Sequence, residues 1–308
     1  MENTKIYTLT LNPAYDIHAH TEHFVPFHEN LARVLSREAG GKGVNISRAL
    51  KLNGTDNTAI IILGKENSAD FKQAVADAEL DAVTFEVDGR IRENLTLHAS
   101  DSDETRISFA GFSVDDSILD EIAAKIEAGE NTVVTFTGRA PAGMSMERIK
   151  AFLLSLKAKG TKIVIDSRSF SLADIIEVSP WLIKPNQEEI SEYFGCEIKN
   201  FSDAAASAES LASKGIENVM ISLGGKGALL YTAGKLFTAK APKIEALSTI
   251  GAGDSSIAGF IAAYSKGRSP EDCLRTAVAF GSAACLTEGT LPPMSKDVSS
   301  IYEMIVTE

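Results

Sequence analysis

The chain has 308 residues, a length that suits one large α/β domain with an appendage or two small domains. Its hydrophobic content of 44% and charged content of 23% are ordinary for a soluble globular protein. The formal net charge of −12 argues against a nucleic-acid-binding surface, so any phosphate site in this protein must gather its cations locally.

The first predicted strand covers residues 6–11 and enters a loop at Asn12-Pro13. Asp16 follows, and an acid just past a strand end lies where α/β sheets place ligand contacts. The alternative is an ordinary turn aspartate. Residues 21–37 show no helical period and are predicted to form strands of a small separate sheet.

A glycine-rich stretch at 39–45 leads into a helix predicted over 46–52. A glycine-rich loop that feeds a helix favours anion binding. It is not a Walker A motif, because Gly43 stands where Ser or Thr should follow the lysine. Asn45 is either a helix cap or a contact for a sugar hydroxyl.

A buried strand is predicted at 58–63 and a helix at 70–78. Three short alternating runs follow at 83–87, 94–99 and 105–109. They predict a β-meander that is inserted between βα units and lies outside the main sheet. Arg92-Glu93-Asn94 in this piece is a candidate phosphate fork, and the alternative is a solvated strand face.

From Asn131 onwards strands and helices alternate, which predicts βαβ units and a mostly parallel sheet. The predicted strands cover 132–137, 162–166, 181–184 and 218–223, and the predicted helices cover 145–159, 187–194 and 203–214. Such sheets bind ligands at the C-terminal ends of their strands. Arg139, Arg168 and Lys184 follow three of these ends, so we expect them at the binding crevice.

Residues 222–227 contain a glycine turn, and a second strand is predicted at 228–231. Together they predict a hairpin whose backbone can approach a nucleotide. Two further helices, at 270–285 and 296–305, flank a loop at 287–290.

Gly251-Ala252-Gly253-Asp254 precedes a buried helix predicted at 255–264. Small residues let the backbone come close to a ligand, and the free amides at a helix start favour negative charge. This is a candidate anion hole, with Asp254 placed to take a proton from a sugar hydroxyl. The alternative is a simple turn with Asp254 as its cap. A Rossmann fingerprint is disfavoured because Ser256 replaces its third glycine.

Three cysteines form no CxxC pair and no even framework, which favours free thiols in a reducing cytosol. No signal peptide opens the sequence, and no apolar run is long enough to span a bilayer. We therefore expect a cytoplasmic protein with neither nucleic acid nor membrane as a partner.

The start Asn12-Pro13-Ala14-Tyr15-Asp16, the Gly40-Gly41-Lys42-Gly43-Val44-Asn45 loop and the 251–254 motif occur in one chain in this order. With them the sequence resembles the phosphofructokinase B family of ribokinase-like sugar kinases, over essentially its whole length. The lysine of the glycine loop and Lys184-Pro185-Asn186 look most like the 1-phosphofructokinase and tagatose-6-phosphate kinase branch.

The resemblance implies one kinase domain over residues 1–308, built as a three-layer α/β/α sandwich around a nine-stranded, mostly parallel sheet. It also implies a small β-sheet lid, formed by segments at about 16–37 and 87–110, which often pairs between subunits into a homodimer.

The resemblance also implies roles for individual residues. Asp254 would be the catalytic base, with Gly251, Ala252 and Gly253 as the anion hole. The substrate would lie on Asp16, Gly40, Gly41, Lys42, Asn45, Arg92 and Asn94, with Arg92 on its phosphate. ATP would lie along Lys184, Asn186, Ser222, Gly224, Gly225, Gly227 and Ser282. Glu189 would act on Mg²⁺ through water or phosphate, and Ser248, Ile250, Thr287 and Gly289 fall where relatives bind a monovalent cation such as K⁺ or the purine end.

The implied activity is ATP-dependent phosphorylation of a phosphosugar, first of all fructose 1-phosphate to fructose 1,6-bisphosphate. Tagatose 6-phosphate and fructose 6-phosphate are alternative substrates. An unphosphorylated sugar or nucleoside is a further alternative, although Arg92 argues against a neutral substrate. A non-catalytic sugar-phosphate sensor is the last, although the intact Asp254 argues against it.

Two positions depart from the family pattern. Gly138-Arg139-Ala140-Pro141 replaces the usual Gly-Ser-x-Pro, and Arg168 stands where a small residue is more usual. The two arginines either grip an anionic group of the substrate or pair with nearby acids. We hypothesise that Arg139 contacts the substrate phosphate.

Overall fold

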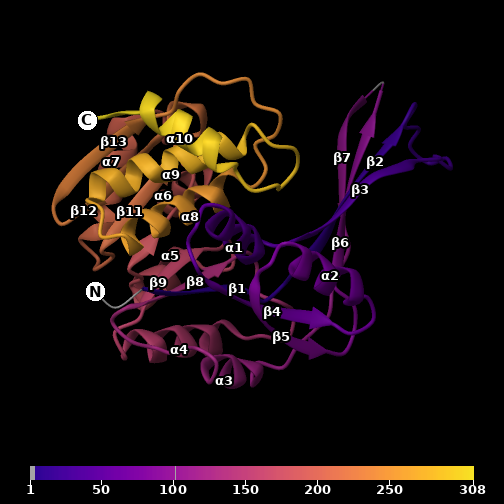
Figure 1. Cartoon of the computed structure of the whole chain (residues 1–308), viewed down its shortest axis with the longest axis horizontal. Helices are drawn as coiled ribbons and strands as arrows, with labels where there is room; N and C mark the ends of the chain where they lie inside the picture. Colours follow the sequence, from indigo (N-terminus) through magenta and orange to yellow (C-terminus); the bar gives the residue numbers. More distant parts are fainter. Residues whose placement is uncertain (1–3, 101) are drawn as a thin grey trace.

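The computed structural model describes residues 4–100 and 102–308, which form a central sheet between two layers of helices (Figure 1). A second, four-stranded sheet extends from one side of this body (Figure 1). The predicted α/β sandwich with a small additional sheet is confirmed. Within the described ranges, no helix is long and apolar enough to cross a bilayer.

The central sheet of the described chain has ten strands, in the order β14-β13-β12-β11-β10-β9-β8-β1-β4-β5. They are β1 Lys5–Thr10, β4 Thr58–Gly64, β5 Asp81–Val87, β8 Thr132–Thr137, β9 Lys162–Asp166, β10 Leu182–Ile183, β11 Asn218–Ser222, β12 Ala228–Thr232, β13 Lys235–Lys240 and β14 Val306–Thr307. From β5 to β11 they pair in parallel, and the rest pair antiparallel. The implied nine strands were one too few, because the chain end covers the otherwise open edge of β13.

Helices cover both faces of this sheet, so its parallel strands are apolar at successive positions. Val133 packs in one buried cluster with α1, α8, α9 and α10, and Val134 packs in another with α3 to α7. The first group is α1 Lys42–Leu52, α8 Ala252–Ser265, α9 Pro270–Ala284 and α10 Ser295–Met304. The second group is α3 Ile118–Ala123, α4 Met146–Lys157, α5 Leu172–Val178, α6 Gln187–Phe194 and α7 Phe201–Ala212.

The small sheet has the strand order β3-β2-β6-β7. Its strands are β2 Ala14–Thr21, β3 Arg33–Gly40, β6 Arg92–Ala99 and β7 Ser102–Ser108. β2 and β6 pair in parallel, and the outer pairs are antiparallel. At its base α2 (Ala69–Asp77) packs Phe71 edge-on against Tyr15 of β2, with ring centroids 5.7 Å apart. This packing joins the small sheet to the body.

Two local predictions were wrong. Residues 83–87 belong to β5, which is the edge of the central sheet, and not to the small sheet. The alternation that suggested a meander is that of an edge strand, in which exposed residues on one face alternate with half-buried residues on the other. The helix expected from residue 46 begins at Lys42, so much of the glycine-rich stretch is helical.

Candidate active site

The start of α8 presents free backbone amides near the C-terminal ends of the parallel strands. Gly251 caps the helix with φ 78°, a left-handed conformation that a side chain would strain. No side chain caps this helix start, and among the described residues the amides of Gly253 and Asp254 donate to no protein acceptor. The alternative in which Asp254 serves as the cap is therefore not what the structure shows. Free amides at a helix start suit a phosphate.

Asp254 is buried in the first turn of α8, with 6% of its surface exposed. Asn45 of α1 donates its Nδ2 to Asp254 Oδ2 at 2.9 Å. Burial is the main cause that raises the pKa of Asp254 to about 6, while Lys42, Asn45 and Lys184 oppose the rise. A buried carboxyl with this pKa is ionised at neutral pH and can accept a proton from a bound hydroxyl.

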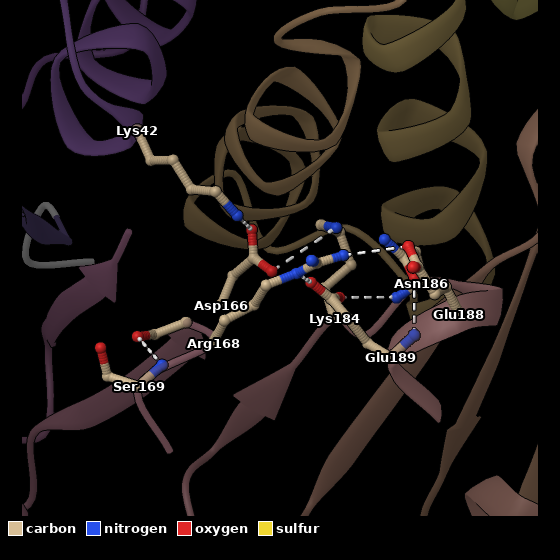
Figure 2. A network of polar contacts seen from close by, with 9 residues as sticks. Lys42, Asp166, Arg168, Ser169, Lys184, Asn186, Glu188 and Glu189 are labelled. Atoms are coloured by element: carbon tan, nitrogen blue, oxygen red, sulfur yellow. Dashed lines mark hydrogen bonds and ion pairs between the residues drawn. The ribbon is translucent and has the colours of Figure 1, made fainter. Parts of the chain in front are cut away.

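A buried carboxylate, Asp166 at the end of β9, lies between two ammonium groups (Figure 2). Lys42 Nζ donates to Asp166 Oδ2 at 2.9 Å, and Lys184 Nζ is 3.9 Å from Oδ1. Burial acts to raise the pKa of Asp166, but Lys184 and Lys42 outweigh it and hold the pKa below its usual value. Burial acts to lower the pKa of Lys42, but Asp166 and Asp254 outweigh it and raise the pKa to about 12. Both partners are thus charged at neutral pH.

Lys184 also lies against the start of α8. A Cβ built on Gly253 would come within 3.2 Å of Lys184 Nζ, so glycine keeps this approach open. The side chain of Lys184 is only 5% exposed. A buried ammonium beside unpaired amides adds to the positive potential at the helix start.

A cavity of about 430 Å³ opens beside these groups, between the small sheet and the strand ends. Among the residues that line it are Thr10, Asn12, Asp16, Gly41, Lys42, Arg92, Asn94, Thr137, Gly138, Arg139 and Arg168. Asn94 Nδ2 donates to Asp16 Oδ1 at 2.8 Å. A Cβ at Gly40 would come within 2.4 Å of Asp16 Oδ2, so the glycine leaves room for this carboxylate. The structure thus brings most predicted substrate residues to one cavity.

Sequence reasoning missed two threonines of this cavity. Thr10 of β1 and Thr137 of β8 are 3% and 6% exposed, and neither hydroxyl has a partner among the described residues. The Oδ1 atom of Asn45 is likewise buried without a partner. Buried polar atoms are normally hydrogen-bonded, so these three atoms are candidate partners for a bound polar ligand or a water molecule. Nothing in the local sequence marked these two threonines, because threonine is common at any position of a strand.

The cavity also holds arginines in two different states. Arg92 donates to Asn94 Oδ1 at 3.1 Å and to the carbonyl of Asn12 at 3.4 Å, and neither Arg92 nor Arg139 forms an ion pair with a described residue. Burial lowers the pKa of Arg92, Asp16 counteracts this, and the nearby charge of Arg139 lowers it further. Arg168 instead pairs with two acids of α6. Arg92 and Arg139 are thus cations with spare binding capacity.

The predicted nucleotide residues lie next along the sheet edge. Asn186 and Glu189 form a reciprocal capping box at the start of α6, with bonds of 2.8 and 3.0 Å. Asn186 also forms a parallel bridge with Ser222, at the end of β11. The predicted hairpin is confirmed, with a 3-10 turn η1 at Gly224–Lys226 between β11 and β12.

The glycines of this turn differ in what they do. Side chains on Gly224 and Gly225 would meet no atom within 4 Å, so their backbone is open to a ligand. Gly227 has φ 107°, and a Cβ there would come within 2.0 Å of the Ala239 carbonyl of β13, so packing requires glycine.

Ser282, the remaining residue predicted for ATP, lies buried on α9.

The four residues predicted for a monovalent cation lie in two adjoining loops. Ser248 Oγ is 3.4 Å from the carbonyl oxygen of Gly289, and the amide of Ile250 donates to Ser248 Oγ at 3.2 Å. Thr287 Oγ1 lies 2.8 Å from the carbonyl oxygens of both Ala284 and Leu291 and can donate its one proton to either. Carbonyl and hydroxyl oxygens suit such a cation.

The carboxylates near the nucleotide residues fit a shared rather than a dedicated Mg²⁺ site. Among the described residues, no cluster of three or more His, Cys, Asp or Glu could hold a metal. Asp166 is paired with two lysines, and Glu189 at the start of α6 accepts from Arg168 on one oxygen and from the Asn186 amide on the other. A contact of Glu189 with the metal would therefore run through water or phosphate. Mg²⁺ commonly binds through one or two carboxylates, water and substrate phosphates, so Glu189 fits such a role.

Comparison with known proteins agrees with this geometry. Residues 10–297 match the pfkB family carbohydrate kinase profile. The 1-phosphofructokinase of Haemophilus influenzae is 32% identical over 91% of this chain and 90% of its own length, and that of Bacillus subtilis is 31% identical over 92% and 93%. A crystal structure of phosphofructokinase-2 from Escherichia coli in complex with potassium superposes with a TM-score of 0.88, 28% identity and coverage of 98% of this chain and 99% of that one. A match of this extent, with these glycines and Asp254 at the sheet edge, makes the chain a member of the pfkB family of carbohydrate kinases.

Proposed function

We propose that this protein is an ATP-dependent kinase that converts fructose 1-phosphate to fructose 1,6-bisphosphate. The observation that carries the substrate class is the pair Arg92 and Arg139, two guanidinium groups without carboxylate partners in the cavity that Lys42 also lines. An acidic protein that keeps two unpaired cations in one cavity provides for an anionic substrate. The 1-phosphofructokinase relatives support the choice of the sugar.

In the proposed reaction, the side chains and amides near the strand ends bind the sugar, accept its proton and stabilise the transferred phosphoryl group. Thr10, Asp16 and Asn94 hold the sugar, and Asp254 takes the proton of the hydroxyl that attacks the γ-phosphorus of ATP. The amides of Gly253 and Asp254, together with Lys42 and Lys184, stabilise the negative charge that builds up. Mg²⁺, bound with ATP, would supply further charge neutralisation, with Glu189 as its contact through water or phosphate.

The ATP phosphates would lie between the start of α8 and the Asn186–Ser222 bridge, with Gly224, Gly225 and Gly227 along the nucleotide. K⁺ would bind at Ser248, Ile250, Thr287 and Gly289. The similar Escherichia coli protein was crystallised in complex with potassium, which supports a role for K⁺ and leaves its position a proposal. The four-stranded sheet would act as a lid, since a kinase must exclude water from the transferred phosphate.

We also propose a homodimer through the small sheet in the cytoplasm. The 25–35 segment exposes Val25, Phe27, Leu31, Val34 and Leu35, and Phe27 is fully exposed. Apolar side chains gathered in this way mark interaction surfaces. Sedimentation equilibrium should give twice the mass of the 32.9 kDa chain, and a monomer at assay concentration would contradict the dimer.

A coupled ATP-to-ADP assay with Mg²⁺ tests the function on fructose 1-phosphate, tagatose 6-phosphate, fructose 6-phosphate and free fructose. We expect a clear preference for fructose 1-phosphate. Arg139→Ser should raise its KM by about tenfold with little change in kcat, because a phosphate contact made in ground and transition state alike affects binding. An unchanged KM would remove Arg139 from the phosphate site. Preference for free fructose would refute the phosphosugar assignment.

A further inference from the structure

Arg168 connects the two halves of the proposed active site. It follows Asp166 by two residues at the end of β9. Together with Lys42 and Arg139 it lines the cavity of about 430 Å³, which we call the acceptor cavity because the proposed sugar would bind there. Its guanidinium reaches the start of α6, where Nε donates to Glu189 Oε1 at 3.2 Å and one terminal nitrogen donates to Glu188 Oε2 at 3.0 Å (Figure 2). Its guanidinium thus lies between the acceptor cavity and the residues proposed for the nucleotide phosphates.

The ion pair with Glu189 differs from an ordinary surface pair. The Glu189 side chain is only 13% exposed, and its second oxygen accepts the amide of Asn186 at 3.0 Å. Two carboxylates on one helix therefore fix the plane of the guanidinium. The Nη1 atom of Arg168 has no acceptor among the described residues, and 46% of the side chain is exposed, so one edge of the fork remains available.

We propose that Arg168 is a catalytic cation that stabilises the phosphoryl group in transit between nucleotide and sugar, held in position by Glu188 and Glu189. This inference rests on the proposed kinase function. In the step, the bond from phosphorus to the ADP oxygen breaks as the bond from the sugar oxygen forms, and the sugar proton passes to Asp254. Arg168 exchanges no proton, and its guanidinium opposes the charge spread over the equatorial phosphoryl oxygens.

Arg168→Ser restores a small residue at this position and is the central variant. We expect kcat to fall by about 10²-fold, the usual cost of removing one donor from a developing charge, with KM for ATP and for the sugar within about threefold. Arg168→Lys should recover part of kcat, because it keeps the charge and loses the fork. Glu188→Gln should lower kcat less than Arg168→Ser, because it removes one support and leaves Glu189 in place.

A binding measurement separates a catalytic role from a structural one. Isothermal titration calorimetry would compare MgADP alone with MgADP plus aluminium fluoride, which mimics the phosphoryl group in transit. Wild type and Arg148→Ser, which changes an exposed arginine of α4 outside the cavity, should bind the aluminium fluoride complex more tightly than MgADP. Arg168→Ser should lose most of that gain while binding MgADP normally.

The outcomes are distinguishable. If Arg168→Ser raised the sugar KM at constant kcat, or kept the full gain from aluminium fluoride, the proposal would be overturned and Arg168 would be a substrate or surface residue. A wild-type protein inactive on all four sugars would refute the proposed function itself. An active wild type with an equally active Arg168→Ser would refute only the role of Arg168.

Discussion

Asp254→Asn is expected to lower kcat by about 10³-fold while MgATP binding stays within about twofold of wild type. The carboxylate is needed when the sugar hydroxyl loses its proton, whereas the free amides of Gly253 and Asp254 remain for the phosphates. Wild-type kcat/KM should itself fall as the pH drops below about 6, because burial raises the pKa of Asp254 in the free protein to about 6 and the protonated acid accepts no proton. Initial rates across pH 5 to 9, with nucleotide titrations at pH 8, measure both effects.

Loss of folding would not explain this result. The folded-state pKa of Asp254 lies above the ordinary value of 3.8, so ionised Asp254 destabilises the fold above that range and the neutral asparagine removes the penalty. The urea midpoint of the variant at pH 8 should equal or exceed that of wild type. Asp297→Asn, which changes an acid in the first turn of α10, is the matched control and should keep full activity. Turnover retained by Asp254→Asn would exclude Asp254 as the base.

The sequence predicted the parts of the fold that follow from continuous burial. Strands β8 and β9 have the predicted ends because both faces of a parallel strand are covered, and the apolar run stops where the cover stops. The strands at the two edges of the central sheet were harder to predict. β13 and β14 went unpredicted and β5 was placed in the wrong sheet, because an edge strand owes its position to pairing that its own sequence does not encode.

The start of α1 was missed because glycine was interpreted as a loop signal. Gly43 lies inside the helix, and a Cβ there would come within 2.4 Å of the Leu9 carbonyl, so this glycine permits close packing on β1. Because α1 begins at Lys42, the side chain of this lysine reaches Asp166. Local pattern cannot distinguish a glycine that bends the chain from one that admits a neighbouring strand.

For the candidate site, the sequence indicated which stretches carry chemistry but not which side chains meet. The Gly251–Asp254 motif and the Asn186–Glu189 spacing are local patterns. The ion pair of Lys42 with Asp166 joins α1 to β9, and the hydrogen bond of Asn45 with Asp254 joins α1 to α8. Both depend on the sheet order, which a single sequence does not give. The same holds for the different environments of Arg139 and Arg168.

The contact of Asp166 with two lysines carries the largest expected effect on stability. Asp166→Asn should lower the free energy of unfolding by about 3 kcal/mol at pH 7, the lower part of the range for breaking a buried pair, because Lys42 is 37% exposed while Lys184 stays buried. Asparagine has nearly the same shape, so the loss reports the missing charge. Urea denaturation gives the value. Asp120→Asn, which breaks an exposed pair with Arg148, is the control and should cost less than about 1 kcal/mol.

The pH dependence of this difference tests its electrostatic cause. The folded-state pKa of Asp166 lies below 3.8, so its contribution is fully present above that value and is lost as the pH falls through the folded-state pKa. The raised pKa of Lys42, about 12, places the alkaline loss above pH 10.5. The stability difference between wild type and Asp166→Asn should therefore be constant from pH 8 to 9, above the titration of Asp254, and shrink below about pH 4. If the stability difference stayed the same at pH 3, the asparagine would destabilise the fold through packing. The charge of Asp166 would then not be what holds the two lysines.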